Sequence, residues 1–342
     1  MARTTPPRPV DIPAVFPELR DHVGTATRLH PRPGAPTVHG SSVGGPLLWP
    51  AQEPWPHCTD EHDYLPSPHR PETVRRWRRI LGAAWGRTRR DEQLQLTEQE
   101  QAELPDLDDC APAELGEQPI AMVPVVQLYR RDTPGFLGPD DTDVLQLLWC
   151  PLDHSDLGYN PRVLPVWRRA ADVGELLSAP PEPLIVSESY LPEPCVLHPE
   201  QVREYEFGGL LPRELDKRIL QWEQDMAERD ADGEPAYSYQ FDLSIAPGWK
   251  LGGFASWHLT DPGPMDCAEC GTPMRLLLTA ATYETNGPAD SWRPVEESRE
   301  PGEFMSLQPD NSPTAVEIGR GYSLWIFYCP VSFGHPPGTT MQ

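Results

Sequence analysis

Hydrophobic residues cluster in short runs that predict four buried strands, over residues 122–129, 144–150, 274–283 and 323–330. Each run is rich in leucine, β-branched and aromatic residues and is bounded by turn residues, as is typical of strands inside a sheet. Residues 184–186 predict a further short strand. Over 237–244, apolar and polar residues alternate, which predicts a strand with one exposed face.

Two other segments repeat their apolar residues at helical spacing. In the segment 211–230 these residues are Leu215, Ile219, Trp222 and Met226. In the segment 71–104 they are Val74, Trp77, Leu81 and Trp85. Both stripes predict helices, and the stripe over 211–230 is expected to pack against a core.

The second of these helices carries many arginines on its other faces. Those that form a possible binding face, the arginine face, are Arg75, Arg76, Arg79, Arg87 and Arg90. Residues 91–117 then contain acidic residues and no basic ones. The arginine face is either a docking surface for an anionic partner or a solvated helix surface. Because charge runs usually face water, the solvated surface is the favoured interpretation.

The two halves of the chain share several features in the same order. The Gly44-Gly45 and Gly252-Gly253 pairs are each followed by an apolar stretch, a tryptophan and a cysteine, and later by a strand that begins near a methionine. Cys150 and Cys329 each follow an aromatic residue at the end of a predicted strand and precede a proline. The order predicts two diverged copies of one β module that share a core.

The expected fold is therefore α+β and rich in strands, with a few peripheral helices. We expect a Pro-rich extended arm over 1–38, a first β-rich repeat over 39–190 and a second over 191–342. The arginine-rich helix and acidic loop, over about 70–117, are expected as an insertion into the first repeat.

Composition narrows the range of partners. The chain has 342 residues and a net charge of −24, which repels nucleic acid and anionic membranes and favours a basic protein partner, unless the charge serves solubility alone. No segment has the length and hydropathy of a membrane span, and the first residues do not resemble an export signal, so a cytoplasmic location is expected. The seven cysteines are then expected as thiols or metal ligands rather than disulfides.

Cysteine spacing predicts a structural zinc site in the second repeat. Cys267 and Cys270 have the C-x-x-C spacing that binds a metal from one tight turn, and Cys329 and His335 can complete a tetrahedral set. His258 is an alternative fourth ligand. A thioredoxin-like redox pair is the main competing interpretation, but no βαβ pattern precedes this motif.

The first repeat carries related residues at equivalent places, His57, Cys58, Cys150 and His154. Adjacent residues such as His57 and Cys58 do not easily bind one metal together, so this group is expected to be an eroded second metal site. Cys110 and Cys195 have no counterpart in the repeat and are expected to be ordinary thiols.

Two functions from different classes fit these features. One is a binding protein, a chaperone or an immunity-type inhibitor, for a basic partner. The other is a zinc-dependent hydrolase or deaminase, since His198 and Glu200 with Cys267 and Cys270 partly match the zinc deaminase signature. Asp266 stands where that signature has proline, and common catalytic motifs are absent, so no catalytic residue is assigned and the binding protein is favoured.

Several segments resemble the YwqG-like family of bacterial proteins of unknown function. They are 43–46 with 55–56, 125–128, 145–146, 249–257 with 267–271, and 327–330. The chain looks like a large actinobacterial branch of that family, from which the arginine-rich insertion and the single Cys58 depart. The second half is more faintly similar to programmed cell death protein two, a ribosomal-protein chaperone, and this likeness implies an acidic clamp for a basic client.

Overall fold

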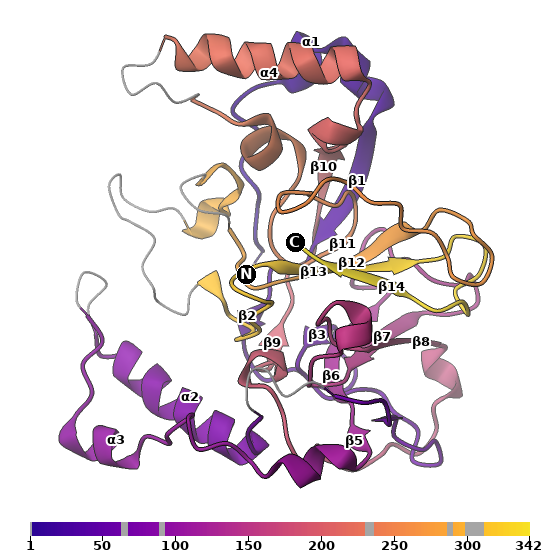
Figure 1. Ribbon diagram of the computed structural model, residues 1–342. Coiled ribbons are helices and arrows are strands. Elements are labelled where there is room, and N and C mark those ends of the chain that lie inside the picture. The colour runs from indigo at the N-terminus through magenta and orange to yellow at the C-terminus, as the bar shows by residue number, and fades with distance from the viewer. Residues whose placement is uncertain (1, 63–67, 89–92, 230–235, 286–289, 298–310) are drawn as a thin grey trace.

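The computed structural model describes residues 2–62, 68–88, 93–229, 236–285, 290–297 and 311–342 (Figure 1). Within these residues fourteen strands form three sheets. The protein is therefore an α+β fold rich in strands, as the sequence predicts. Among the described helices, none is both long and apolar enough to cross a membrane.

Both large sheets are six-stranded and antiparallel. Sheet A has the order β10 (Glu200–Tyr205), β1 (Val23–Arg28), β11 (Lys250–Gly252), β12 (Arg275–Ala281), β13 (Ser323–Tyr328) and β14 (Gly338–Met341). Sheet B has the order β2 (Arg32–Pro33), β9 (Cys195–Val196), β3 (Ser42–Val43), β6 (Val123–Tyr129), β7 (Val144–Trp149) and β8 (Val163–Arg168). The small third sheet pairs β4 (His57–Cys58) with β5 (Ile120–Ala121).

One hydrophobic core joins the two large sheets. Val125, Leu145 and Leu147 of sheet B belong to the same buried cluster as Leu277 and Leu324 of sheet A. The opposite faces of the sheets are also covered, sheet B by Trp49 and Trp55 and sheet A by Trp257. Burial on both faces explains why β6, β7, β12 and β13 read as nearly continuous apolar runs.

The helices lie at the ends of the sheet system. α1 (Ile12–Val15) and α4 (Arg213–Ala227) lie at one end, and α2 (Pro71–Trp85) and α3 (Glu98–Glu103) at the other (Figure 1). The stripe predicted for α4 packs with Leu215 and Ile219 buried. α2 begins with a proline, as many helices do, and a capping box of Thr97 and Glu100 starts α3.

Two strand pairs carry the same irregularity at the same place. Between β6 and β7 the register shifts at Val125, and between β12 and β13 it shifts at Leu277. Each bulge follows two paired residues at the start of its strand. As a result Trp149 and Tyr328, the residues before Cys150 and Cys329, pair with equivalent positions on their neighbouring strands.

The expected Pro-rich arm over 1–38 is not an arm. It contains α1, β1 and β2, and β1 is an inner strand of sheet A between β10 and β11. The sequence of β1 has no continuous apolar run, but Ala26, Thr27 and Arg28 are buried. The backbone of β1 thus pairs with two neighbouring strands, although its side chains do not have the pattern typical of a strand.

The expected boundary at 190/191 does not separate the sheets either. β9, which follows that boundary, pairs with β2 and β3 in sheet B, and β1, from the first residues of the chain, lies in sheet A. Two of the smaller predicted strands also differ. Residues 184–186 form only an isolated bridge, between Val186 and His69, and Tyr239–Ser244 is a helical turn.

Candidate metal centres

The four residues predicted as metal ligands in the second half lie together and form what we call the surface cluster: Cys267, Cys270, Cys329 and His335. All four ligand atoms lie within 4.8 Å of one another. The Sγ atoms of Cys270 and Cys329 are 3.5 Å apart, and Cys267 Sγ is 3.4 Å from His335 Nδ1. A tetrahedron with metal–sulfur bonds of about 2.3 Å has edges of about 3.8 Å, so the spacing fits a four-coordinate metal.

A tight hairpin positions the first two ligands. Cys267 N donates to Thr272 O at 2.9 Å, and Gly271 N donates to Cys267 O at 2.8 Å. Gly271 adopts a φ of +68°, which a glycine reaches without strain. The loop between Asp266 and Pro273 thereby turns both thiols to one side.

The other two ligands follow strand β13. Cys329 is the first residue after the strand, and a turn at Ser332 accepts the His335 backbone N–H at 3.2 Å. With His335 Nδ1 facing the thiols, its Nε2 lies 3.5 Å from Glu269 Oε2. A carboxylate on the far nitrogen orients the ring of many metal-binding histidines.

Metal binding requires thiolates, and the surroundings favour the thiolate at two of the three cysteines. Hydrogen bonds from Thr272 lower the pKa of Cys270 to about 6. Burial raises the pKa of Cys329, but the backbone N–H groups of Ser332 and Val331 outweigh it and bring the pKa below the usual thiol value. Burial holds the pKa of Cys267 above that value.

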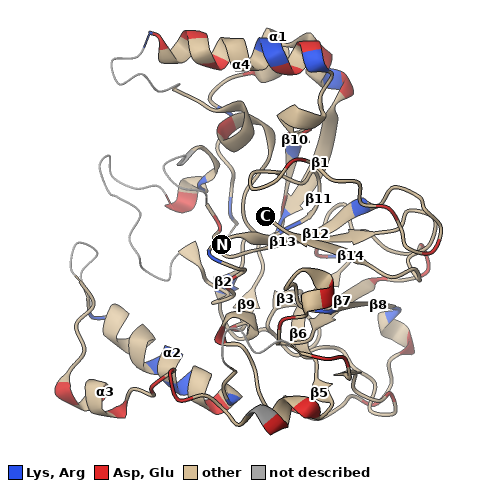
Figure 2. Ribbon diagram, in the orientation of Figure 1, with Lys and Arg blue, Asp and Glu red and all other residues tan. Residues whose placement is uncertain are grey.

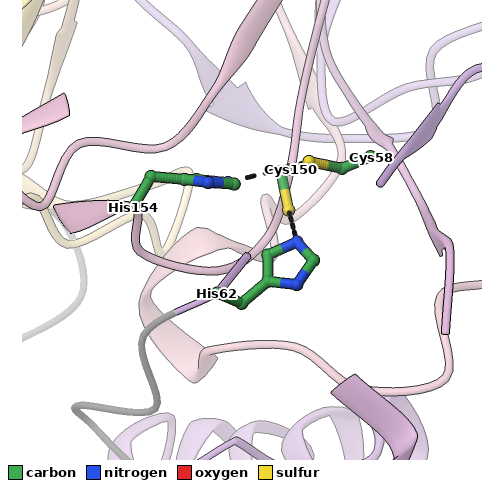
Figure 3. Close-up of side chains that lie close together, drawn as sticks. All are labelled: Cys58, His62, Cys150 and His154. Carbon is green, nitrogen blue, oxygen red and sulfur yellow. Dashed lines mark hydrogen bonds between the residues drawn. The ribbon is translucent and has the colours of Figure 1, made fainter. Parts of the chain in front are cut away.

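The first half contains a second group, the buried cluster: Cys58, His62, Cys150 and His154 (Figure 3). These ligand atoms also lie within 4.8 Å of one another. Cys150 Sγ is 3.3 Å from His62 Nε2, and Cys58 Sγ is 3.8 Å from His154 Nε2. Either cluster could hold a metal ion.

Three parts of the chain bring the buried cluster together. Cys58 is the last residue of β4, Cys150 is the first after β7, and His154 begins a turn closed by its bridge to Asn160. A hydrogen bond from the Cys150 thiol lowers the pKa of Cys58, whereas burial raises the pKa of Cys150. Within this pair, Cys58 is the group that ionises first.

The histidine expected at the second site is not the one the structure places there. His57 is exposed, and its Nδ1 lies 2.9 Å from Trp55 O. Side chains alternate along a strand, so His57 points away from the side on which Cys58 is buried. His62 takes its place, and the signal that could have found it is the Cys-x₃-His spacing from Cys58.

The remaining sequence candidates lie apart from these clusters. His258 is exposed, with Nδ1 2.8 Å from Ser256 O, so it is not the fourth ligand. Glu200 lies on β10, where its carboxylate accepts hydrogen bonds from Thr5, and belongs to neither cluster. Of the two unassigned thiols, Cys110 is exposed and Cys195 is buried, donating to Pro313 O at 3.2 Å.

Some arginines of the arginine face are paired and others are exposed. Figure 2 shows basic residues along α2 and acidic residues on the neighbouring α3. Arg75 forms an ion pair with Glu182, and Arg87 pairs with Glu100 at 2.6 Å. Arg76 and Arg79 are exposed, and Arg90 lies outside the described residues.

Arg78, on the same helix, instead attaches α2 to the sheets. It donates to the carbonyls of Leu191 and Ala315 at 2.5 and 2.9 Å and pairs with Glu193 at 3.2 Å.

An apolar groove lies beside the surface cluster. It has a volume of about 720 Å³, and the residues that line it include Phe207, Leu210, Phe254, Trp257, Met265 and Met274. Glu206 and Asp266 are among its polar residues. Met265 and Met274 are joined by a backbone hydrogen bond of 2.7 Å that closes the hairpin of Cys267 and Cys270. One wall of the groove is therefore part of the surface cluster's own loop.

No protein-family model matches the chain, and no curated protein matches it in sequence.

Proposed function

We propose that this chain is a non-catalytic binding protein in which a structural zinc ion in the surface cluster supports the wall of the apolar groove. The observation that carries this proposal is the closed set of four cysteine and histidine ligands next to that groove. Structural zinc sites use four protein ligands, whereas catalytic ones leave a position for water or substrate.

The donor set favours zinc over other metals. Three thiolates and one imidazole in a tetrahedral arrangement are ligands for zinc rather than for calcium, magnesium or manganese, which prefer oxygen. The carboxylate of Glu269 behind His335 adds the kind of outer contact that such sites have. Fixing the 266–273 loop would in turn fix Met265 and Met274 at the groove.

The proposed partner is a basic protein that inserts an apolar segment into the groove. Aromatic and methionine side chains suit apolar anchors, because they supply large and adaptable contact surfaces. The net charge of −24 attracts a basic chain over a long range and repels acidic ones. A chaperone or an immunity-type inhibitor of a basic protein would have these properties.

We further propose that the two sheets descend from one duplicated module and that the chain is a YwqG-like protein. The matched bulges at Val125 and Leu277, and the matched positions of Cys150 and Cys329, support the duplication. Kinship with the YwqG-like family rests on the sequence segments alone.

A zinc-dependent hydrolase or deaminase is the second candidate from the sequence. It needs a metal position open to water and a nearby carboxylate that can move a proton. Glu269 is a carboxylate beside the surface cluster, but it faces the far nitrogen of His335 rather than the thiols. A metal bound by all four protein ligands would lack the open position that this candidate requires.

The test is zinc content by mass spectrometry, followed by the absorption spectrum of cobalt-substituted protein. We expect Cys267→Ala/Cys270→Ala to lose one zinc equivalent relative to the parent, whereas Cys110→Ala, an exposed thiol outside both clusters, keeps it. Cobalt should show the intense bands of a tetrahedral, thiolate-rich site. Five-coordinate cobalt with a water ligand would overturn the structural role and favour the enzyme.

A further inference from the structure

We infer that the buried cluster is a second zinc site. It attaches the neck of the arginine-rich insertion, meaning the place where the chain leaves after Cys58 and returns at Ile120, to sheet B. The proposed function above rests on the surface cluster, so this site stands on separate residues.

Burial is the first argument. Cys150 and His154 are 0% exposed, Cys58 is 4% exposed and His62 is 6% exposed. Their surroundings are apolar, with Ile120, Leu152 and Ile185 in the same cluster as the two cysteines. Polar side chains in such a place are costly unless strong partners satisfy them.

The hydrogen bonds within the group are weak partners for such buried side chains. The two sulfur–nitrogen contacts, of 3.3 and 3.8 Å, are made by thiols, which are weak hydrogen-bonding groups, and Cys58 Sγ also lies 3.9 Å from Asp60 Oδ2. A zinc ion at the centre would replace both contacts with coordinate bonds to the two thiolates and to Nε2 of each histidine.

The ring of His62 is already oriented for metal binding through Nε2, because its Nδ1 contacts a backbone carbonyl. His62 Nδ1 lies 3.3 Å from Gly116 O, and a proton on Nδ1 leaves the Nε2 lone pair free to face Cys150. Such backbone contacts fix the tautomer of metal-binding histidines. Gly116 belongs to the 3-10 helix Ala113–Glu117, at the end of the insertion.

The place of the cluster in the fold is an independent argument. Cys150 and Cys329 each follow a strand whose neighbour, β6 or β12, carries an equivalent bulge, so each thiol emerges at the equivalent end of its sheet. In both clusters the partners come from a preceding cysteine and from a histidine shortly after the proline. The donor sets differ, with two histidines in the buried cluster and one in the surface cluster.

The insertion leaves the sheet just after Cys58 and returns at Ile120, which is paired with Cys58. A metal bound by Cys58 and His62 on one side and by Cys150 and His154 on the other would therefore tie the start of the insertion to the end of β7. Through Gly116 it would also hold the returning strand. Its loss should loosen the neck before the rest of the sheet.

The decisive experiment counts zinc in protein dialysed against metal-free buffer. We expect two zinc ions in the parent, one in Cys267→Ala/Cys270→Ala and one in His62→Ala. His57→Ala is the matched control, because His57 is a neighbouring histidine outside the cluster, and it should retain both ions. If the buried cluster binds zinc and the surface cluster does not, Cys267→Ala/Cys270→Ala keeps the zinc content of the parent, whereas His62→Ala loses one ion.

X-ray absorption on the unmodified parent covers the case in which His62→Ala fails to fold. Two sites would share five sulfur and three nitrogen ligands between two zinc ions, whereas the surface cluster alone would show three sulfurs and one nitrogen on one zinc. A folded parent with a single zinc that Cys267→Ala/Cys270→Ala removes would overturn the second site. A disulfide between Cys58 and Cys150, seen as two thiols lost on titration of the denatured protein, would overturn it as well.

Discussion

Cys150 and Cys329 occupy equivalent positions in different sheets, each immediately after a strand that pairs with a bulged neighbour. Each is nearly or fully buried, and each lies near a cysteine from a distant part of the sequence and a histidine that follows it within a few residues. Possible metal ligands therefore converge at the equivalent end of both sheets. In sheet B they are buried, and in sheet A they are partly exposed.

Removing metal from the surface cluster should destabilise the second half of the chain. We expect Cys267→Ala/Cys270→Ala to lower the melting temperature by several degrees, because structural zinc contributes to folding free energy. Calorimetry of zinc-loaded protein gives the measurement. A melting temperature equal to that of Cys110→Ala would contradict the prediction.

Arg78 should contribute more than Arg79 to the attachment of α2 to the sheets. Arg78→Ala removes a largely buried guanidinium that donates to three backbone carbonyls and pairs with Glu193, at a cost of about 3 kcal/mol. Hydrogen exchange of the α2 amides should rise in this variant. Arg79→Ala is the control, since Arg79 is exposed, and equal exchange in both variants would show that α2 is held by other contacts.

Stability should fall in weak acid because of His30. Burial lowers the pKa of this histidine to about 4, against 6.5 when unfolded, and the acceptors nearby, Glu200 and Glu284, do not offset the effect. Between these values the unfolded chain binds a proton that the folded chain does not. The free energy of unfolding therefore decreases as pH falls from about 6.5 to 4, by roughly 3 kcal/mol from this group.

His30→Asn tests this dependence, because asparagine tolerates the positive φ of 44° at this position. Urea unfolding at pH 7 and at pH 5 should show a smaller difference in the variant than in the parent. His39→Asn, at an exposed histidine, should behave like the parent. If the variant and the parent lose the same stability, another group causes the acid sensitivity.

The groove should bind a basic peptide with apolar anchors better than one without them. A fluorescent lysine–leucine peptide is the probe, and a lysine–serine peptide of equal charge is its control. Leu210→Asp, at the groove, should weaken binding of the first peptide about tenfold. Leu220→Asp, at a leucine of similar exposure on α4, should leave it unchanged. Undiminished binding in Leu210→Asp would argue that the peptide is held by charge alone, because the new carboxylate attracts a basic peptide.

Elements with a strong period could be predicted from the sequence. The runs that became β6, β7, β12 and β13 are apolar enough to be buried on both faces, and the stripe of α4 matches its packed side. β1 could not be found in this way, since its buried positions include Thr27 and Arg28, which hydrophobicity does not reveal.

The segment 237–244 shows how one pattern can fit two structures. Its alternation predicts a strand, but the Ser238 hydroxyl accepts from Phe241 N and starts a helical turn. Tyr239 and Leu243, four residues apart, are then buried together, while Phe241 is 40% exposed. A local cap and tertiary burial thus outweigh the alternation.

The surface cluster could be located from spacing because C-x-x-C is a local motif and its partners follow a predicted strand. The buried cluster could be located only in part. His62 belongs to it through the path of the chain after β4, and the adjacent His57 is an equally plausible ligand by sequence alone.

β1 comes from the first half of the chain but lies in sheet A, and β9 comes from the second half but lies in sheet B, so the chain cannot be cut into two complete sheets. A chain cut near residue 190 would yield an N-terminal piece that keeps β1 but lacks β9, and a C-terminal piece with the converse defect. Each fragment would expose an unsatisfied sheet edge where the missing strand belongs. Neither half is a sound expression target alone, and the two should regain structure only when mixed, as complementing fragments of one cooperative unit.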